Sequence, residues 1–377
     1  MHGGKISSMD NFERISKEAV KNLLFHCAEG KAGQSLLIVH ESNDQPFYDP
    51  LLPPLVSKHA RELGFHVTFE EIAFDPDVKD PDPQLVQAMR LADHTLFLAR
   101  LGDQIRFRPG SESFSKIISY AIDSDMLASD FGIADYRGFE ALKAAINKVM
   151  ANASSIHVSC PAGTDFSGHI KNSEQVLVEV EIKRFPMSIF TPVPTLHFSG
   201  RIAQNGFLVG TGSQYYTPYA CALKETLFVD FEGNSITEFR GCEEDISTAE
   251  NHYKFVAKKY GIDPYFVHSW HAGIHPACQF TAPASESFER WSGSAFGNPR
   301  LLHFHTCGEY PPGEISLNIV DPTIVVDGEA LWESGQLHPN RLPGGSSILC
   351  KYPTIARIFE SPSSDIGLAQ NGRLSYT

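Results

Sequence analysis

Five of the sixteen histidines lie within residues 268–305, and imidazole is a common ligand of zinc, iron and manganese. They are His268, His271, His275, His303 and His305. Segment 268–276 is too rich in Gly and Pro for a helix interior, which excludes a metalloprotease H-E-x-x-H helix. In an extended chain His271 and His275 share one face, as do His303 and His305. Imidazoles converging from two strands would form a metal site; the alternative is a set of hydrogen-bonded histidines beneath loops.

A carboxylate and a thiol follow on the next stretch of chain. In a strand, Glu314, Ser316 and Asn318 point to one side. Glu314 is then a metal ligand or a general base, or else an exposed residue that caps the preceding Pro-Pro-Gly turn. Cys307 has only His305 beside it as a base, so nucleophilic catalysis is weakly indicated. The sequence lacks the G-x-S-x-G motif of α/β hydrolases.

The elements of the first 154 residues must form an α/β domain. Apolar runs at 35–39, 65–69 and 95–99 predict buried strands, and the segments between them have helical spacing. This alternation predicts an open, mostly parallel sheet. No glycine-rich phosphate loop follows any of these strands.

The remaining residues predict a different architecture. Short strands broken by Gly and Pro begin near 155, after a helical pattern at 139–150, so we expect a domain boundary between 150 and 159. Residues 155–335 are predicted to form a strand-rich α+β domain that carries the site. Residues 336–377 are predicted to form a loop-rich extension. We expect a cleft between the two domains, lined by 269–276 and 303–314.

Charge and composition limit the possible partners. The 377 residues carry a formal charge of −14 and no basic run, which excludes nucleic acids and anionic membranes as electrostatic partners. No apolar stretch approaches 18 residues, and the start lacks an apolar signal core, so a cytoplasmic location is expected. Seven scattered cysteines without a C-x-x-C pair favour reduced thiols. A homo-oligomer is compatible with these features.

Several short motifs, in this order, resemble the thermophilic aminopeptidase (aminopeptidase T/S) superfamily. They are an α/β first domain, Cys160-Pro161-Ala162-Gly163-Thr164-Asp165, a His-containing loop, Gly297-Asn298-Pro299, and 315–326 running into Asp327-Gly328. The branch most similar to the chain is 2,5-dihydroxypyridine 5,6-dioxygenase. The resemblance implies a two-domain architecture like that of aminopeptidase T.

The resemblance also implies a metal site. Its aminopeptidases hold two metals, whereas its dioxygenase holds one Fe(II) with two His and an Asp, and both end in a His-x-Asp pair on a strand. Here Ser316 and Asn318 stand at those positions, and 186–190 lacks the carboxylate of the aminopeptidases. The expected site is therefore a relocated one-metal centre in which His271, His303 and Glu314 are the ligands, with His268 as an alternative to His271 and His305 as an alternative to His303.

The expected function is that of a mononuclear metalloenzyme, most concretely an Fe(II)-dependent ring-opening dioxygenase acting on a small hydroxylated aromatic or heteroaromatic acid. Two alternatives remain: a metal-free, degenerate protein that binds a peptide or small molecule in a biosynthetic pathway, and a metal-dependent aminopeptidase. The expected catalytic residues are Glu314, His305 and His268. The expected substrate contacts are Trp270, His275, Thr164, Asp165 and Tyr310, although Thr164 and Asp165 also suit a structural role in the turn at Gly163.

Overall fold

The computed structural model describes residues 3–42, 47–78, 80–106, 115–170, 182–308 and 312–377. The chain forms two compact units: Met1–Phe139 with Glu179–Met187, and Glu140–Val178 with Ser188–Thr377. The division falls within helix α7 (Tyr136–Asn152), earlier in the chain than the expected boundary at 150–159. The first unit also includes the later segment Glu179–Met187. Strand β5 (Ile156–Ser159), the first of the second unit, begins where the sequence pattern changes.

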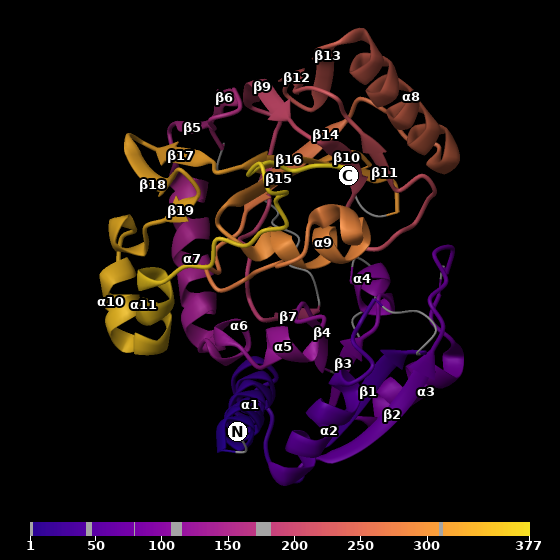
Figure 1. Cartoon of the computed structure of the whole chain (residues 1–377), viewed down its shortest axis with the longest axis vertical. Coiled ribbons are helices and arrows are strands. Elements are labelled where there is room, and N and C mark those ends of the chain that lie inside the picture. The colour runs from indigo at the N-terminus through magenta and orange to yellow at the C-terminus, as the bar shows by residue number, and fades with distance from the viewer. Residues whose placement is uncertain (1–2, 43–46, 79, 107–114, 171–181, 309–311) are drawn as a thin grey trace. The chain divides into compact units, whose positions relative to one another are not determined.

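The first unit is built around a five-stranded sheet in the order β2-β1-β3-β4-β7, and every pairing in it is parallel. This confirms the predicted parallel sheet. Its strands are β1 (Ser35–Glu41), β2 (His66–Ile72), β3 (His94–Leu98), β4 (Ser115–Ser119) and β7 (Lys183–Phe185). Its helices are α1 (Gly3–Lys21), η1 (Asn22–Cys27), α2 (Leu52–Glu62), α3 (Pro83–Leu91), α4 (Leu101–Ile105), α5 (Ser124–Leu127) and α6 (Asp130–Ile133) (Figure 1).

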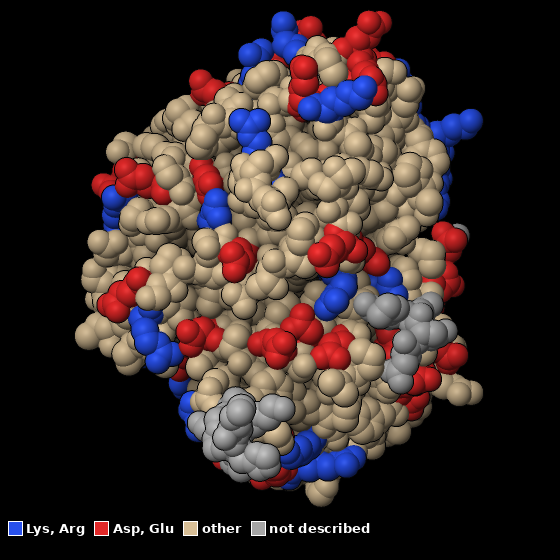
Figure 2. All heavy atoms as spheres, in the orientation of Figure 1, with Lys and Arg blue, Asp and Glu red and all other residues tan. Residues whose placement is uncertain are grey.

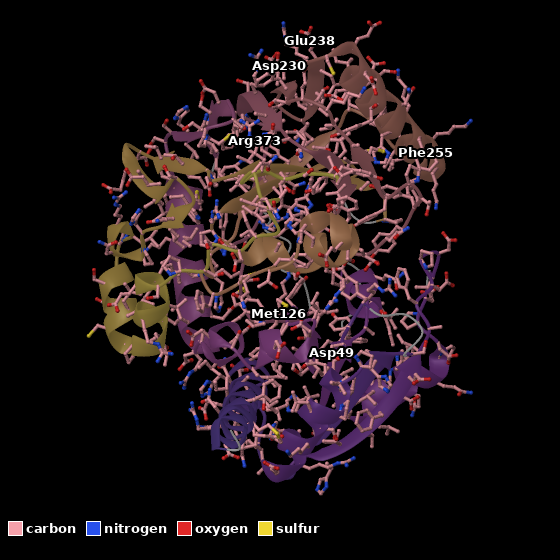
Figure 3. The ribbon with its side chains drawn as sticks, viewed as in Figure 1. Asp49, Met126, Asp230, Glu238, Phe255 and Arg373 are labelled. Carbon is pink, nitrogen blue, oxygen red and sulfur yellow. The ribbon has the colours of Figure 1, made fainter. Side chains whose placement is uncertain are left out.

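Short polar contacts fix the connections of this sheet. Asp82 accepts a hydrogen bond from Gln84 N and so caps α3, whose first residue is a proline. Asp49, labelled in Figure 3, accepts hydrogen bonds from the backbone N and the hydroxyl of Ser124, which anchors the start of α5.

The carboxyl ends of β1 and β3, where ligands often bind in such sheets, carry a buried ion pair. Arg100 Nε and Nη2 donate to the two Glu41 oxygens at 3.0 and 2.8 Å. Glu41 Oε1 also accepts from Arg100 N at 2.6 Å. At β1 and β3 this end of the sheet is therefore occupied by the chain's own side chains, in keeping with the lack of a phosphate loop in the sequence.

The second unit contains two antiparallel sheets. The six-stranded sheet has the order β11-β10-β16-β15-β14-β8, and the eight-stranded sheet has the order β13-β12-β9-β6-β5-β17-β18-β19. The first consists of β8 (Val193–Pro194), β10 (Phe207–Gly210), β11 (Ala220–Ala222), β14 (Val267–Ala272), β15 (Leu301–Cys307) and β16 (Glu314–Val320). The second adds to β5 the strands β6 (Asp165–Gly168), β9 (Phe198–Gln204), β12 (Leu227–Glu232), β13 (Ser235–Arg240), β17 (Thr323–Val326), β18 (Glu329–Glu333) and β19 (Gln336–Leu337).

Aromatic side chains hold the two sheets together. Phe166 of the larger sheet lies 5.6 Å from Trp270 and 5.1 Å from Phe304 of the smaller one, measured between ring centroids. Phe231 also contacts Phe304 at 5.6 Å. Because side chains alternate along a strand, Trp270 and Phe304 turn their neighbours His271, His303 and His305 to the other face of the six-stranded sheet.

Helices complete the second unit. They are α8 (Glu243–Tyr260), η2 (Ala284–Glu286), α9 (Phe288–Ser294), η3 (Ala295–Gly297), η4 (Pro339–Arg341), α10 (Gly345–Lys351) and α11 (Pro353–Glu360). The last two are short helices in the segment that the sequence pattern predicted to be loop-rich. No described helix combines the length and the apolar character needed to cross a bilayer. On the face drawn in Figure 2, acidic and basic side chains are interspersed.

Candidate metal centre

Three adjacent strands bring the candidate residues onto one face of the six-stranded sheet. His271 of β14 lies opposite His303 of β15, and His303 in turn lies opposite Asn318 of β16. His305 lies opposite Ser316 in the same ladder. The two predicted segments therefore meet as paired strands. All five side chains are buried, which is unusual for so many polar groups on one sheet face.

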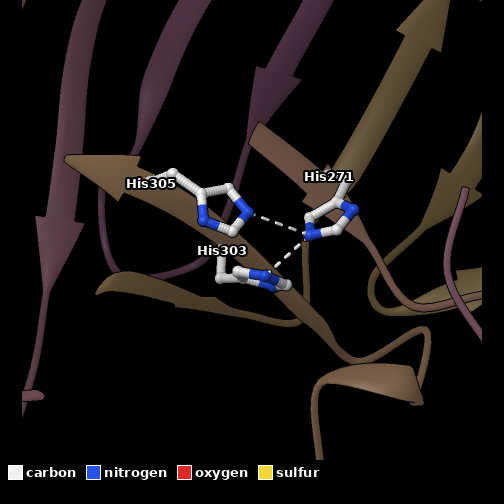
Figure 4. A group of neighbouring side chains, drawn as sticks. All are labelled: His271, His303 and His305. Atoms are coloured by element: carbon white, nitrogen blue, oxygen red, sulfur yellow. Dashed lines mark hydrogen bonds between the residues drawn. The ribbon is translucent and has the colours of Figure 1, made fainter. Parts of the chain in front are cut away.

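The three imidazoles converge through their Nε2 atoms (Figure 4). His271 Nε2 lies 2.7 Å from His303 Nε2 and 3.2 Å from His305 Nε2. Three nitrogens bound to one ion at roughly 2.1 Å lie about 3.0–3.4 Å from one another, so the observed spacing is close to that of a metal's first shell. Among the described residues these three form a group whose ligand atoms all lie within 4.8 Å of one another.

The contacts on the other ring nitrogens assign the tautomers of two histidines. His271 Nδ1 lies 3.0 Å from the Phe190 carbonyl, and His305 Nδ1 lies 2.8 Å from Glu314 Oε1. A carbonyl and a carboxylate only accept hydrogen bonds, so both Nδ1 atoms carry the proton when the rings are neutral. Their Nε2 lone pairs then face each other, an arrangement that a bound cation stabilises. Metal-binding histidines commonly have such Nδ1 partners.

Glu314 lies beside the histidine cluster and binds one of its members. Its carboxylate is not in the group of ligand atoms within 4.8 Å of one another, where His305 takes the place that the sequence analysis gave to Glu314. The reason is register: Glu314 lies opposite Cys307 at the end of the β15–β16 hairpin and reaches the far side of the His305 ring. Glu314 Oε2 is buried and has no hydrogen-bond partner among the described residues.

Two aromatic rings border the cluster. Phe296 of η3 stacks on His303 with a centroid distance of 4.1 Å and an interplanar angle of 26°. Phe190 meets the edge of His271 at 6.2 Å and supplies its backbone carbonyl to the same ring. These apolar neighbours lower the local dielectric and strengthen any charge interaction at the imidazoles.

Three other expected site residues, Trp270, His268 and His275, are outside the group of three histidines. Trp270 lies in the aromatic core between the sheets, on the opposite face of β14 from His271. His268 Nδ1 lies 2.8 Å from Ser269 Oγ. His275 follows the end of β14, so the face expected to be shared with His271 is not formed; full burial lowers its pKa to about 3.

The residues of the turn near Gly163 have structural partners. Thr164 Oγ1 accepts a hydrogen bond from Ala203 N and is buried, whereas Asp165 is exposed and contacts His157 at 2.9 Å. These contacts support the structural interpretation of the turn. Tyr310 lies outside the described residues. Burial raises the pKa of the Cys307 thiol to about 12, which does not favour a nucleophilic thiolate.

Ser316 and Asn318 are hydrogen-bonded to each other rather than directed only at the histidines. Ser316 Oγ donates to Asn318 Oδ1 at 2.9 Å, and Gln204 Oε1 accepts from the backbone N of Asn318. The two positions face the cluster through cross-strand pairing, so they are neutral polar neighbours of His303 and His305.

Sequence reasoning missed the roles of Phe190 and Phe296. Phe190 acts through its backbone carbonyl, which residue type does not reveal. Phe296 precedes the Gly297-Asn298-Pro299 motif, but its stacking on His303 depends on the turn from η3 into β15. The sequence does contain a signal for His305: it lies two residues after His303, and residues two apart on a strand share a face.

Comparisons with known proteins address the fold. No protein-family model and no curated protein matches the sequence. Among solved structures, the chain is similar to 2,5-dihydroxypyridine dioxygenase from Pseudomonas putida KT2440, with a TM-score of 0.58 and 16% identity over 89% of this chain and 98% of that one. It is also similar to AmpT from Thermus thermophilus, with a TM-score of 0.47 and 12% identity over 87% and 99% of the two chains. The similarity to the dioxygenase structure shows a shared fold.

Proposed function

We propose that the protein is a mononuclear metalloenzyme in which His271, His303 and His305 hold one metal ion. The convergence of three buried Nε2 atoms supports this proposal, because two of the rings have their Nδ1 protons fixed by acceptors. The orphaned oxygen of Glu314 adds negative charge beside the cluster, which suits a cation there. Imidazole donors suit iron, zinc and other divalent transition metals.

The most concrete form of this function is an Fe(II)-dependent ring-opening dioxygenase that acts on a small hydroxylated aromatic or heteroaromatic acid. The similarity in fold to a dioxygenase supports this choice. An iron ion bound there would supply Lewis acidity and redox chemistry at open coordination positions. The chain's own contribution is to orient the imidazoles through Phe190 and Glu314 and to exclude water with Phe296.

A metal-free binding protein is the second candidate, and Ser316 with Asn318 favours it. These neutral side chains are poor ligands and satisfy each other. We expect the double variant Ser316→His with Asn318→Asp to increase metal affinity in either case. If only this variant binds iron and the wild type does not, the binding protein is the better description.

The test of the leading proposal combines metal analysis with oxygen consumption. Protein purified without chelator is expected to contain close to one equivalent of iron or to take it up on anaerobic reconstitution. A panel of hydroxylated pyridines and hydroxybenzoic acids is then expected to include a compound that supports oxygen uptake. Iron binding without oxygen uptake for any compound would retain the metal site and remove the dioxygenase assignment.

A further inference from the structure

The first unit contains an arginine, Arg184, for which the described part of the chain supplies no ion pair. Arg184 lies on β7 opposite Ile118 of β4, so its side chain shares a face with an apolar cluster that includes Ile118 and Ile182. The side chain is only partly exposed. It makes no hydrogen bond or ion pair with any residue in the described part of the chain.

This arrangement differs from that of other arginines withdrawn from water. Arg100 binds Glu41, Arg106 binds Asp103, and Arg300 binds Asp321. A guanidinium that loses hydration without an anion destabilises the fold. Burial is the main cause that lowers the pKa of Arg184. The positive charge of Arg106 acts in the same direction, whereas Tyr120 and the carboxylate of Asp103 act against it.

Further hydrogen-bond donors surround this position at the carboxyl ends of β4 and β7. Tyr120 follows β4, and its backbone N donates to Phe185 O at 2.6 Å. Its hydroxyl oxygen accepts from Arg106 Nη1 at 3.1 Å, which leaves the hydroxyl proton available to a further acceptor. The carboxyl ends of the strands are the edge at which open parallel sheets bind ligands.

We propose that Arg184, with Arg106 and the Tyr120 hydroxyl beside it, binds an oxyanion, either a carboxylate or a phosphate, at this edge of the first unit. The planar guanidinium binds both groups through paired N–H donors. The anion would compensate the charge of Arg184, whereas Arg106 already has Asp103 at 2.9 Å. General electrostatic attraction does not explain such a site in a chain with a formal charge of −14.

Calorimetric titration of the full-length protein with sodium benzoate and with sodium phosphate, at constant ionic strength in chloride, tests the proposal. We expect saturable binding of at least one anion. The anion that binds with the higher affinity shows whether the site prefers a carboxylate or a phosphate. Arg184→Gln should weaken this binding about tenfold or more, because the charge-assisted hydrogen bonds to the anion are lost. Arg61→Gln is the matched control: Arg61 is exposed, and its guanidinium donates to Val67 O at 3.3 Å.

A second measurement keeps the test independent of folding. In anion-free buffer, Arg184→Met should unfold at a temperature equal to or above that of the wild type, because an uncompensated charge is removed. A clear decrease would show a structural partner for Arg184 and contradict the proposal. So would the absence of binding of either anion, or unchanged binding by Arg184→Gln. Metal content measured on the same variants shows whether the metal site is intact, independently of anion binding.

Discussion

The Nε2 atoms of His271 and His305 lie 3.2 Å apart, and an acceptor holds the Nδ1 atom of each ring. Two neutral imidazoles in this arrangement direct lone pairs at each other. His303 approaches His271 Nε2 from a third direction at 2.7 Å. A shared proton would relieve one of these contacts, whereas a single metal ion would relieve them all, and this difference supports the proposed metal centre.

Each histidine of the cluster should be needed for metal retention. Replacing His271, His303 or His305 by alanine removes one of three ligands and is expected to lower metal content below a tenth of the wild-type value. His157→Ala, at an exposed position on β5, is the control and should keep wild-type content. Full retention in His305→Ala would exclude this residue as a ligand.

Glu314 should act through His305. Glu314→Gln retains an acceptor for His305 Nδ1 but loses the charge, so we expect metal affinity to fall about 10–100-fold. Glu314→Ala removes the acceptor as well and should lower affinity further. Competition with a chelator of known affinity measures both effects. Equal affinity in the wild type and both variants would show that the 2.8 Å contact has no role in metal binding.

Trp270 should contribute to stability and not to the metal centre. Its indole is fully buried between the sheets, so Trp270→Phe is expected to lower the free energy of unfolding by about 1–3 kcal/mol. Metal content should not change. Phe255→Leu on α8, labelled in Figure 3, is the partly exposed control and should have a small effect on denaturant unfolding. Loss of metal in well-folded Trp270→Phe would contradict this assignment.

His252 should make the protein less stable in acid. Burial lowers its pKa from 6.5 to about 4, so between these values the unfolded chain takes up a proton that the folded chain does not. The stabilising contribution is therefore complete above pH 6.5 and is lost as the pH falls towards 4. His252→Gln removes the uptake of up to one proton on unfolding. The slope of the unfolding free energy against pH should therefore fall by up to about 1.4 kcal/mol per pH unit. Denaturant unfolding at several pH values measures this slope, and an identical slope in the variant would contradict the prediction.

The sequence predicted the parallel sheet because its strands are short, apolar and separated by helical segments. It did not predict the return of β7 to that sheet, since Lys183–Phe185 is too short for a periodic pattern. The helices α10 and α11 were also missed, because Pro343, Gly344, Gly345 and Pro353 indicate loops although they lie at or just before helix starts.

Local sequence patterns likewise indicate only part of the candidate site. Alternation on β15 places His303 and His305 on one face from sequence alone. The pairing of β14 with β15, which brings His271 opposite His303, is a long-range contact that no local pattern specifies. The register of the β15–β16 hairpin, in which Glu314 lies opposite Cys307, decides that His305 rather than Glu314 joins the group.

X-ray absorption spectroscopy of the iron-reconstituted wild-type protein, compared with His305→Ala, tests the central claim most directly. We expect a first shell containing three imidazole nitrogens at about 2.0–2.2 Å in the wild type. In the variant we expect the loss of one of these nitrogens or of the iron itself. A wild type that binds no iron under anaerobic conditions, or a spectrum without imidazole scattering, would contradict it.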